Sequence, residues 1–364
     1  MTYFSKRIPS LDGLRAVSIL LVISGHAYQG IYKQSPNSAA SLIFGNAGFG
    51  VDIFFVISGF LITSLLLTEN RIDGTIHIRE FYLRRIFRIL PAMLVFILSV
   101  HILGKSGLIL ESSTGALLSA LTFTTNYSPF ANSNALAHFW SLSVEEQFYL
   151  AWPGALFVAL RSGNRKNAVI IAIAIIATAP IIRVLTHLFG SEFLANRIYY
   201  MFHTRIDALM FGCALALLLD NKRFEIFFKF IKPIIPWAFF LIFFISPLLT
   251  KRYGGYYIYT VGYTVEGLAI ALFLLWAVRQ PQSVIGRTLN SKLMVHLGKI
   301  SYSLYLWQEL ALKTDSIIDQ FPLLALLLSF ALAEISYHFV ERPGLDLRQL
   351  LKRRSLARAN ATDA

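Results

Sequence analysis

Cysteine is almost absent from this sequence, and charged residues are scarce. The 364 residues include one cysteine, Cys213, which excludes an intrachain disulfide framework and argues against a metal site with cysteine ligands. Charged residues make up 15% of the chain, against about 25% in a typical soluble domain, while 56% of the residues are hydrophobic. This composition excludes an ordinary soluble protein and predicts a membrane protein with several spans.

Acidic residues are also few, since 20 Asp and Glu stand against 33 Lys and Arg and give a net charge of +13. In a soluble chain this balance would suggest nucleic acid as a partner. Here the basic residues lie mostly between apolar segments, where they report the orientation of a membrane protein, so no nucleic-acid partner is expected. The basic start, residues 1–9, precedes an apolar run that is too long for a cleavable signal peptide.

The alternation of basic loops decides which of eleven apolar segments cross the membrane. Lys6 and Arg7 place the N-terminus in the cytoplasm, and the arginines between 71 and 88 place the second loop there. The segment 114–127 is short and rich in Thr, Ser and Asn, so it is expected to be re-entrant or interfacial. The predicted fold is all-α, with about ten transmembrane helices and both termini cytoplasmic. The expected spans are 12–30, 47–67, 86–104, 144–160, 167–188, 206–220, 233–250, 258–278, 296–312 and 321–340.

The chain divides into two parts in this interpretation. Residues 1–343 form one transmembrane domain, and residues 344–364 form a basic cytoplasmic tail that lies on the anionic inner leaflet. The loop 189–205 is assigned to the outside although it carries Arg197 and Arg205. Because topology does not explain these two arginines, a contact with a sugar or a phosphate is expected for them.

The first apolar segment carries charges that a simple span would avoid. The twenty residues Ser10–Gln29 are enough to cross a bilayer core of about 30 Å, yet they include Arg15 and His26. These two residues are eleven positions apart, so they return to within about 20° of the same helix face, about 16 Å apart along the axis. One helix stripe therefore offers a cation near one end and an imidazole deeper in the membrane, which indicates a site.

Carboxylates are expected at the same level as His26. Asp52 begins the second span, and Glu145 and Glu146 enter the fifth span from the same side, close to His138. Ionisable groups at bilayer depth usually face a bundle interior or a wet cavity. A histidine oriented by a carboxylate can act as general base on a sugar hydroxyl. A helix-dipole role accounts equally well for one of the two glutamates, but not for both.

The stretch Arg79–Ala92 predicts a phosphate site on the cytoplasmic side. Arg85 and Arg88 share a helix face, and Arg84 is turned by about 100° from Arg85. Arginine forks suit the phosphates of a coenzyme A thioester, although any inner loop collects arginines for topology alone. Arg15 favours the first interpretation, since it sits deeper than topology requires. Tyr302 is a further candidate for donor contact, with an aromatic belt as the default explanation.

In their order along the chain, these motifs resemble the acyltransferase-3 family of integral-membrane O-acetyltransferases, which decorate O-antigen, exopolysaccharide, Nod factors and macrolides. The matching features are Arg15 followed by His26, the pair Arg85 and Arg88, and the sequences GVDIFFVISGFLIT, FWSLSVEEQFYLAWP and SYSLYLW. The resemblance covers residues 8 to about 343. Any one of these motifs is weak, but five in order are highly specific.

The resemblance implies acetyl-CoA as a cytoplasmic acyl donor and a glycan or lipid-linked saccharide as acceptor at the outer face of the bacterial cytoplasmic (inner) membrane. It implies that Arg15 and His26 are essential, and that Arg85 and Arg88 bind the donor. It also implies that Glu145 or Glu146 supports catalysis. Gln308 stands where many relatives have a histidine. Larger relatives carry an SGNH-type domain after this region, so a single-module transferase is expected.

The sequence therefore predicts a membrane O-acetyltransferase in which His26 acts as general base. The acetyl group is transferred either directly within a ternary complex, which is favoured, or through a transiently acetylated His26. No metal is expected, and the oligomeric state is not predicted. The alternative from another class is a proton-coupled transporter of a small solute, because buried ionisable groups also form proton relays. No inverted repeat, which would favour transport, is evident in the sequence.

Overall fold

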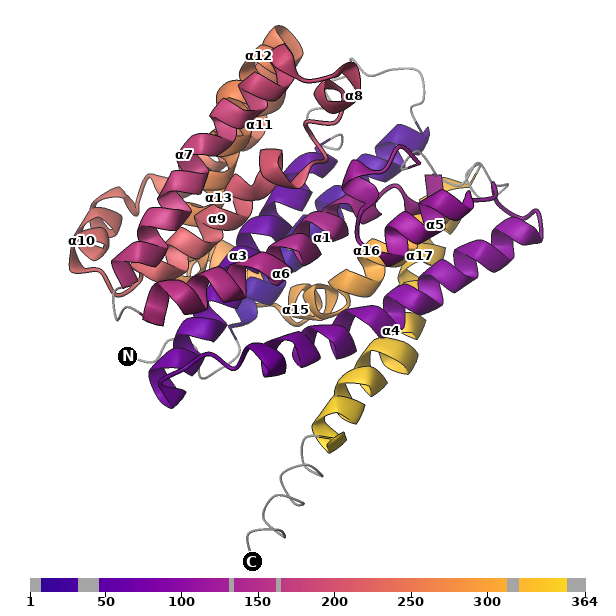
Figure 1. The fold of residues 1–364 in the computed structure, drawn as a ribbon, viewed down its shortest axis with the longest axis horizontal. Coiled ribbons are helices and arrows are strands. Elements are labelled where there is room, and N and C mark those ends of the chain that lie inside the picture. The colour runs from indigo at the N-terminus through magenta and orange to yellow at the C-terminus, as the bar shows by residue number, and fades with distance from the viewer. Residues whose placement is uncertain (1–7, 32–45, 131–133, 162–164, 313–320, 352–364) are drawn as a thin grey trace, which may run out of the picture.

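The computed structural model describes residues 8–31, 46–130, 134–161, 165–312 and 321–351. Lys6 and Arg7, on which the predicted position of the N-terminus depends, lie outside these ranges. All regular structure in the described residues is helical, so the predicted all-α fold is confirmed. Figure 1 shows α1 and α3 in the middle of the bundle, with α7, α11 and α13 on one side and α4 and α17 on the other.

The first half of the chain supplies four long helices. Pro91 and Pro153 lie inside two of them, α4 and α6. The predicted re-entrant or interfacial segment contains one short helix, α5, and a 3₁₀ turn. The helices are α1 (Pro9–Ile31), α3 (Ala47–Asp73), α4 (Ile78–Lys105), α5 (Thr114–Leu121) and α6 (Phe139–Arg161), with 3₁₀ turns η1 (Thr125–Tyr127) and η2 (Asn134–Leu136).

The second half adds the remaining helices and two π-helical turns. The helices are α7 (Arg165–Phe189), α8 (Glu192–Ala195), α9 (Phe202–Leu218), α10 (Lys222–Ile231), α11 (Ile235–Tyr253), α12 (Gly255–Tyr257), α13 (Tyr263–Arg279), α14 (Val284–Leu289), α15 (Lys292–Lys299), α16 (Ser301–Leu312) and α17 (Pro322–Ser336), and the π-helical turns are η3 (Ile258–Gly262) and η5 (Tyr337–Glu341).

A helix lies at each of the ten places where a span is expected, but the count of ten is not confirmed. Seven helices in the described residues are long and apolar enough to cross a membrane, or eight if α9 and α10, bent by 113° at their junction, count as one span. α6 and α16 are not among them. The seven are Pro9–Tyr28, Ala47–Asp73, Ile78–Lys105, Arg165–Phe189, Ile235–Tyr253, Gly255–Arg279 and Pro322–Leu351. These spans establish a multi-pass membrane protein.

The last helix runs through the boundary predicted at residue 343. The helix Pro322–Leu351 contains the π-helical turn η5 and then continues past Pro343 without a break. Arg348 Nη2 lies 3.9 Å from Glu80 Oε2 of α4, so the start of the predicted tail packs on the bundle. Residues 352–364 lie outside the described part of the chain, and the division into a domain and a tail stays a prediction.

The central helix α1 packs against α3, α15 and α16. Its contact with α15 is unusually close, because a Cβ atom on Gly298 would lie 1.9 Å from the carbonyl oxygen of Asp12. A Cβ atom on Gly13 would lie 2.1 Å from the carbonyl oxygen of Leu289 in α14. Small residues let backbones approach in this way. The two glycines therefore fix the position of α1, which carries Arg15 and His26.

Candidate functional site

A pocket opens between α1, α3, α4, α6 and α16, with about 770 Å³ of empty space that includes open solvent. Six of the nine predicted site residues line it, so two arginines of the predicted cluster and the glutamate pair, which are far apart in the sequence, meet in one place. The six residues are Arg15, Arg85, Arg88, Glu145, Glu146 and Tyr302.

Three arginines face this pocket without a fixed anionic partner among the residues that the structure describes. In the described part of the chain, the guanidinium groups of Arg15, Arg85 and Arg88 make no hydrogen bond, and no carboxylate lies within ion-pair distance of them. Arg85 stacks on the ring of Tyr149, with 4.0 Å between its Cζ and the ring centroid. A guanidinium held by an aromatic face keeps its N–H groups available for a ligand. The pocket is therefore built to receive an anion.

The two glutamates enter the pocket from α6. Glu145 accepts a hydrogen bond from the hydroxyl of Ser58 in α3, which fixes the carboxylate. Arg85 and Arg15 attract Glu145 electrostatically, and Arg85 also attracts Glu146. The carboxylates balance part of the positive charge but leave the arginine N–H groups unbonded. Tyr302 completes this wall and donates from its hydroxyl to the carbonyl oxygen of Ile89, 2.9 Å away.

Glu341 is a charged neighbour of the pocket that the sequence analysis missed. It is 3% exposed, and Ser303 Oγ donates to its Oε2 at 3.0 Å. Arg88 and Arg15 attract it electrostatically. Glu341 ends the π-helical turn η5, and such turns are frequent at functional sites. In the sequence it stands directly before Arg342 and Pro343, as an ordinary charge at a helix end would. The sequence therefore contains no sign that its side chain is buried.

Arg84, predicted to bind the donor with Arg85 and Arg88, does not line the pocket. Its Nη2 lies 3.4 Å from Glu69 Oε2 of α3. The turn of about 100° from Arg85 directs its side chain to this partner instead. The structure therefore separates Arg84 from the two arginines with which the sequence grouped it.

His26 lies beyond the pocket, toward the other end of α1. Its Nδ1 is 2.8 Å from Oε1 of Gln308 in α16. Gln308 is the position at which many relatives were expected to have a histidine. The helix stripe predicted from the spacing of Arg15 and His26 therefore begins in the pocket, at Arg15. It ends at His26, which contacts the neutral amide of Gln308.

Asp52, predicted to share a cavity with His26, instead pairs with Arg205 of α9, and both side chains are buried. Arg205 also stacks on Tyr263, with 3.8 Å between its Cζ and the ring centroid. A sugar contact is therefore not needed to explain Arg205. Arg197 Nη2 donates to the carbonyl oxygen of Thr125 at 3.0 Å.

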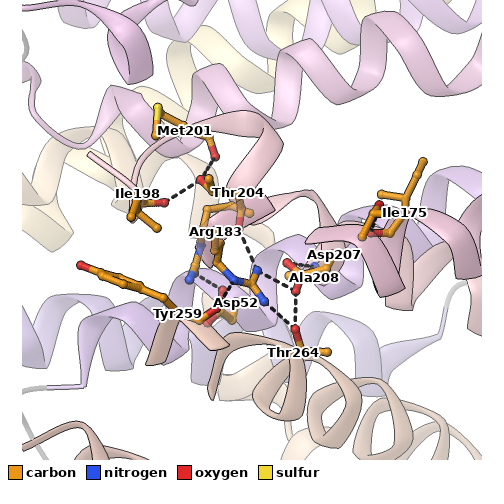
Figure 2. A network of polar contacts seen from close by, with 12 residues as sticks. Asp52, Ile175, Arg183, Ile198, Met201, Thr204, Asp207, Ala208, Tyr259 and Thr264 are labelled. Atoms are coloured by element: carbon orange, nitrogen blue, oxygen red, sulfur yellow. Dashed lines mark hydrogen bonds and ion pairs between the residues drawn. The ribbon is translucent and has the colours of Figure 1, made fainter. Parts of the chain in front are cut away.

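A second buried ion pair lies beside Asp52. Figure 2 shows Arg183 of α7 directed at Asp207 of α9 and at Thr264 of α13. Arg183 also donates through Nε to the carbonyl oxygen of Tyr259 at 2.9 Å. These contacts join three helices and give the buried Asp207 a structural role.

The remaining buried or membrane-level charges also have partners. His138 Nδ1 lies 2.5 Å from Glu309 Oε2, and both side chains are at most 2% exposed. Glu266 accepts a hydrogen bond from Ser246. Glu334 Oε1 lies 2.5 Å from His296 Nε2.

One group among the described residues has the spacing to hold a metal ion. It consists of Glu69, Asp73 and His77, near the end of α3. The group lies outside the pocket, and Glu69 is already paired with Arg84. The pocket itself offers the guanidinium groups of Arg15, Arg85 and Arg88, which suit an anionic ligand.

Comparison with known proteins supports the resemblance. The acyltransferase domain of the acyltransferase-3 family matches residues 8–334. The chain is 31% identical over 369 residues to "Putative peptidoglycan O-acetyltransferase YrhL" of Bacillus subtilis (strain 168). It is 28% identical over 373 residues to peptidoglycan O-acetyltransferase OatA of Listeria monocytogenes serovar 1/2a.

Each of the two alignments covers 94% of this chain, but 55% of the Bacillus protein and 56% of the Listeria protein. The chain thus spans about half the length of the curated relatives it matches. No solved structure matches the chain. Because the matched domain covers most of its length, the chain belongs to the acyltransferase-3 family of membrane proteins.

Proposed function

We propose that this protein transfers an acetyl group from acetyl-CoA to a hydroxyl of a cell-surface or lipid-linked glycan. The observation that carries the proposal is the pocket, in which Arg15, Arg85 and Arg88 present guanidinium groups that pair with no carboxylate of the described residues. A phosphorylated thioester is the donor chemistry that such a pocket favours. Membership of an acyltransferase family agrees with it.

The donor binds with its phosphates at the arginine end of the pocket. Arg85 and Arg88 belong to α4, and Arg15 belongs to the first part of α1. From there the pantetheine arm extends along α1, and the spacing of Arg15 and His26 corresponds to about 16 Å of helix. An extended arm covers this separation, so the thioester reaches the level of His26.

His26 then acts as the base. It takes the proton from the acceptor hydroxyl as the oxygen attacks the acetyl carbonyl. The new C–O bond forms, the C–S bond of the thioester breaks, and the proton passes from His26 to the coenzyme A thiolate. Direct transfer of this kind is the preferred mechanism. In the alternative, His26 attacks the thioester itself, and the C–S bond breaks to release coenzyme A. The acceptor oxygen then attacks the acetyl group, the C–N bond to His26 breaks, and the hydroxyl proton passes to the imidazole.

The names of the relatives support a glycan acceptor. OatA of Listeria monocytogenes is named a peptidoglycan O-acetyltransferase, so peptidoglycan is the first acceptor to test. Lipopolysaccharide and exopolysaccharide are the further candidates. The proposed location is the bacterial cytoplasmic membrane, with the donor arriving from the cytoplasm and both termini on that side.

Binding and turnover of radiolabelled acetyl-CoA by purified protein in nanodiscs test the proposal. The wild type is compared with Arg15→Ala and His26→Ala. We expect His26→Ala to bind the donor but to lose about 10²–10⁴-fold in turnover, because a positioned base contributes that much. We expect Arg15→Ala to weaken binding.

An outcome without acetyl-CoA binding, with all three proteins well folded, would overturn the proposal. The buried ionisable groups would then favour the other class considered, a proton-coupled transporter. Proton-driven uptake of a solute into proteoliposomes is the corresponding measurement.

A further inference from the structure

The structure links His26 to a residue that the functional proposal does not use. Gln308 is fully buried, and its Oε1 lies 2.8 Å from Nδ1 of His26. Its Nε2 atom has no hydrogen-bond partner among the described residues. Burying a primary amide with half of its polar groups unpaired costs free energy. A residue kept there at that cost has a role that packing alone does not explain.

Gln308 also lies on the continuation of a pocket wall. Ser301 and Tyr305 line the pocket, and Gln308 follows them at helical spacings of seven and three residues on α16. Residues at these spacings share one helix face. α1 and α16 pack against each other, so this face of α16 runs from the pocket toward the histidine end of α1.

The neighbouring residue provides a comparison within the same helix. Glu309 contacts His138, with Oε2 at 2.5 Å from Nδ1 and at 2.8 Å from the backbone nitrogen of His138. α16 thus gives two consecutive side chains to two different histidines. His138, which does not line the pocket, receives a carboxylate, whereas His26 receives a neutral amide.

The neutral partner has a chemical consequence. When a carbonyl oxygen accepts the proton of Nδ1, the lone pair of the neutral imidazole lies on Nε2. Unlike a carboxylate, the amide does this without favouring the protonated ring by a full negative charge. His26 is then held in one orientation and one tautomer, with Nε2 as the nitrogen that carries the lone pair.

We propose that Gln308 is a positioning residue that holds His26 with its proton on Nδ1 and Nε2 as the base. The effect that this inference predicts on kcat rests on the proposed function. The tautomer itself is independent of that function. The experiment below therefore has one kinetic and one spectroscopic part.

The kinetic part compares Gln308→Met, which keeps the length of the side chain but removes the hydrogen bond, with Gln308→Glu, which keeps the acceptor oxygen. We expect Gln308→Met to lower kcat at least about tenfold. This loss should be smaller than the loss caused by removing the base in His26→Ala. KM for acetyl-CoA should change little, because Gln308 does not line the pocket.

At high pH, Gln308→Glu should have about the same kcat as the wild type, because it keeps the acceptor oxygen. Its carboxylate favours the protonated form of His26, so the acidic limb of the pH–rate profile should move upward by about one pH unit or more. Glu309→Gln is the matched control, since it makes the reverse exchange one residue away. It should lower thermal stability and leave the acidic limb in place.

The spectroscopic part uses ¹⁵N-histidine NMR in bilayers, with His26 assigned by loss of its signal in His26→Asn. We expect the proton on Nδ1 in the wild type and a mixture of tautomers in Gln308→Met. Donor binding and the thermal midpoint show that each variant is folded.

A wild type with the proton on Nε2, or a Gln308→Met variant with unchanged tautomer and kcat, would overturn the inference. If the wild type turns over no acetyl-CoA, the proposed function falls while the NMR result still decides the role of Gln308. The two failures are therefore distinguishable.

Discussion

Arg183 Nη1 lies 2.9 Å from Asp207 Oδ2, and neither side chain exposes more than 1% of its surface. The pair joins α7 to α9, and Arg183 also donates to the backbone carbonyl oxygens of Thr204 and Tyr259. A buried ion pair of this kind is costly to break, because the remaining partner keeps its charge without compensation.

Arg183→Met should therefore destabilise the protein by about 3–5 kcal/mol. The substitution leaves the carboxylate of Asp207 buried without its cation. The expected result is a lower thermal midpoint in detergent and a smaller monodisperse fraction after size-exclusion chromatography. The double variant Arg183→Met/Asp207→Leu removes both charges and should recover much of the loss. An equal loss in both variants would show that the unpaired carboxylate is not the cause.

The contact between α1 and α15 gives a second prediction. Gly298→Ala places a methyl carbon 1.9 Å from the carbonyl oxygen of Asp12, which is too close for a contact, so the two helices must separate. We expect a cost of about 1–3 kcal/mol, typical of an overpacked interface, together with weaker donor binding because Arg15 moves with α1.

Gly154→Ala is the matched control for this prediction. Gly154 also lies within a helix, α6, but a Cβ atom there would meet nothing within 4 Å. Replacing an unconstrained helical glycine by alanine should be neutral or stabilising by up to about 1 kcal/mol. The thermal midpoints of the two variants should therefore change in opposite directions or differ by several degrees. Equal midpoints would contradict the close packing of α15 on α1.

Much of the fold could be predicted from the sequence. Long apolar segments separated by basic loops have no alternative to helices in a bilayer, so the helix positions follow directly. Arg15 and the two glutamates that line the pocket were identified from their depth, since charge at that depth has to face a cavity or a partner. Arg85 and Arg88 were identified from their shared helix face. Arg15 is the clearest case, because topology alone does not require it.

The partners of these charges could not be predicted. Asp52 pairs with Arg205, 153 positions later, and His26 contacts Gln308, 282 positions later. Helical periodicity places a residue on a face, but it does not say which other helix that face meets. Arg84 differs from Arg85 only by its rotation about the helix axis, and that rotation takes it to Glu69 and out of the pocket.

The turn between α9 and α10 predicts a dependence of stability on pH. Asp220 Oδ2 lies 2.8 Å from Arg165 Nη1 and 2.7 Å from Arg71 Nη2, and the hydrogen bond from Arg165 holds the pKa of Asp220 below its ordinary value of 3.8. A carboxyl with a depressed pKa stabilises the folded state above its unfolded pKa and loses this contribution as pH falls through the folded value. Because the pair is half exposed, the contribution should be less than about 1 kcal/mol.

The thermal midpoints of the wild type and Asp220→Asn measure this contribution. The wild type should be the more stable protein at pH 7, and the difference should shrink below pH 3.8, as the wild-type carboxyl is protonated through its depressed pKa. A difference that stays constant between pH 7 and pH 2.5 would show that the carboxylate charge is not responsible.

The pocket predicts different consequences for two arginines of the same helix. Arg88→Lys keeps the positive charge but removes the planar fork that binds phosphate in bidentate fashion. We expect the affinity for radiolabelled acetyl-CoA in nanodiscs to fall about tenfold, which corresponds to about 1.4 kcal/mol. Raising the salt concentration should weaken wild-type binding as well, because the contact is ionic.

Arg84→Lys is the control for this comparison. Arg84 lies four residues before Arg88 on α4, but its guanidinium pairs with Glu69 and does not line the pocket. A lysine there can keep the pairing with Glu69, so the affinity for acetyl-CoA should stay within about twofold of the wild type. If Arg84→Lys weakened binding as much as Arg88→Lys, the donor phosphates would be held by the basic surface of α4 in general. The orientation of Arg88 into the pocket would then not be what selects the donor.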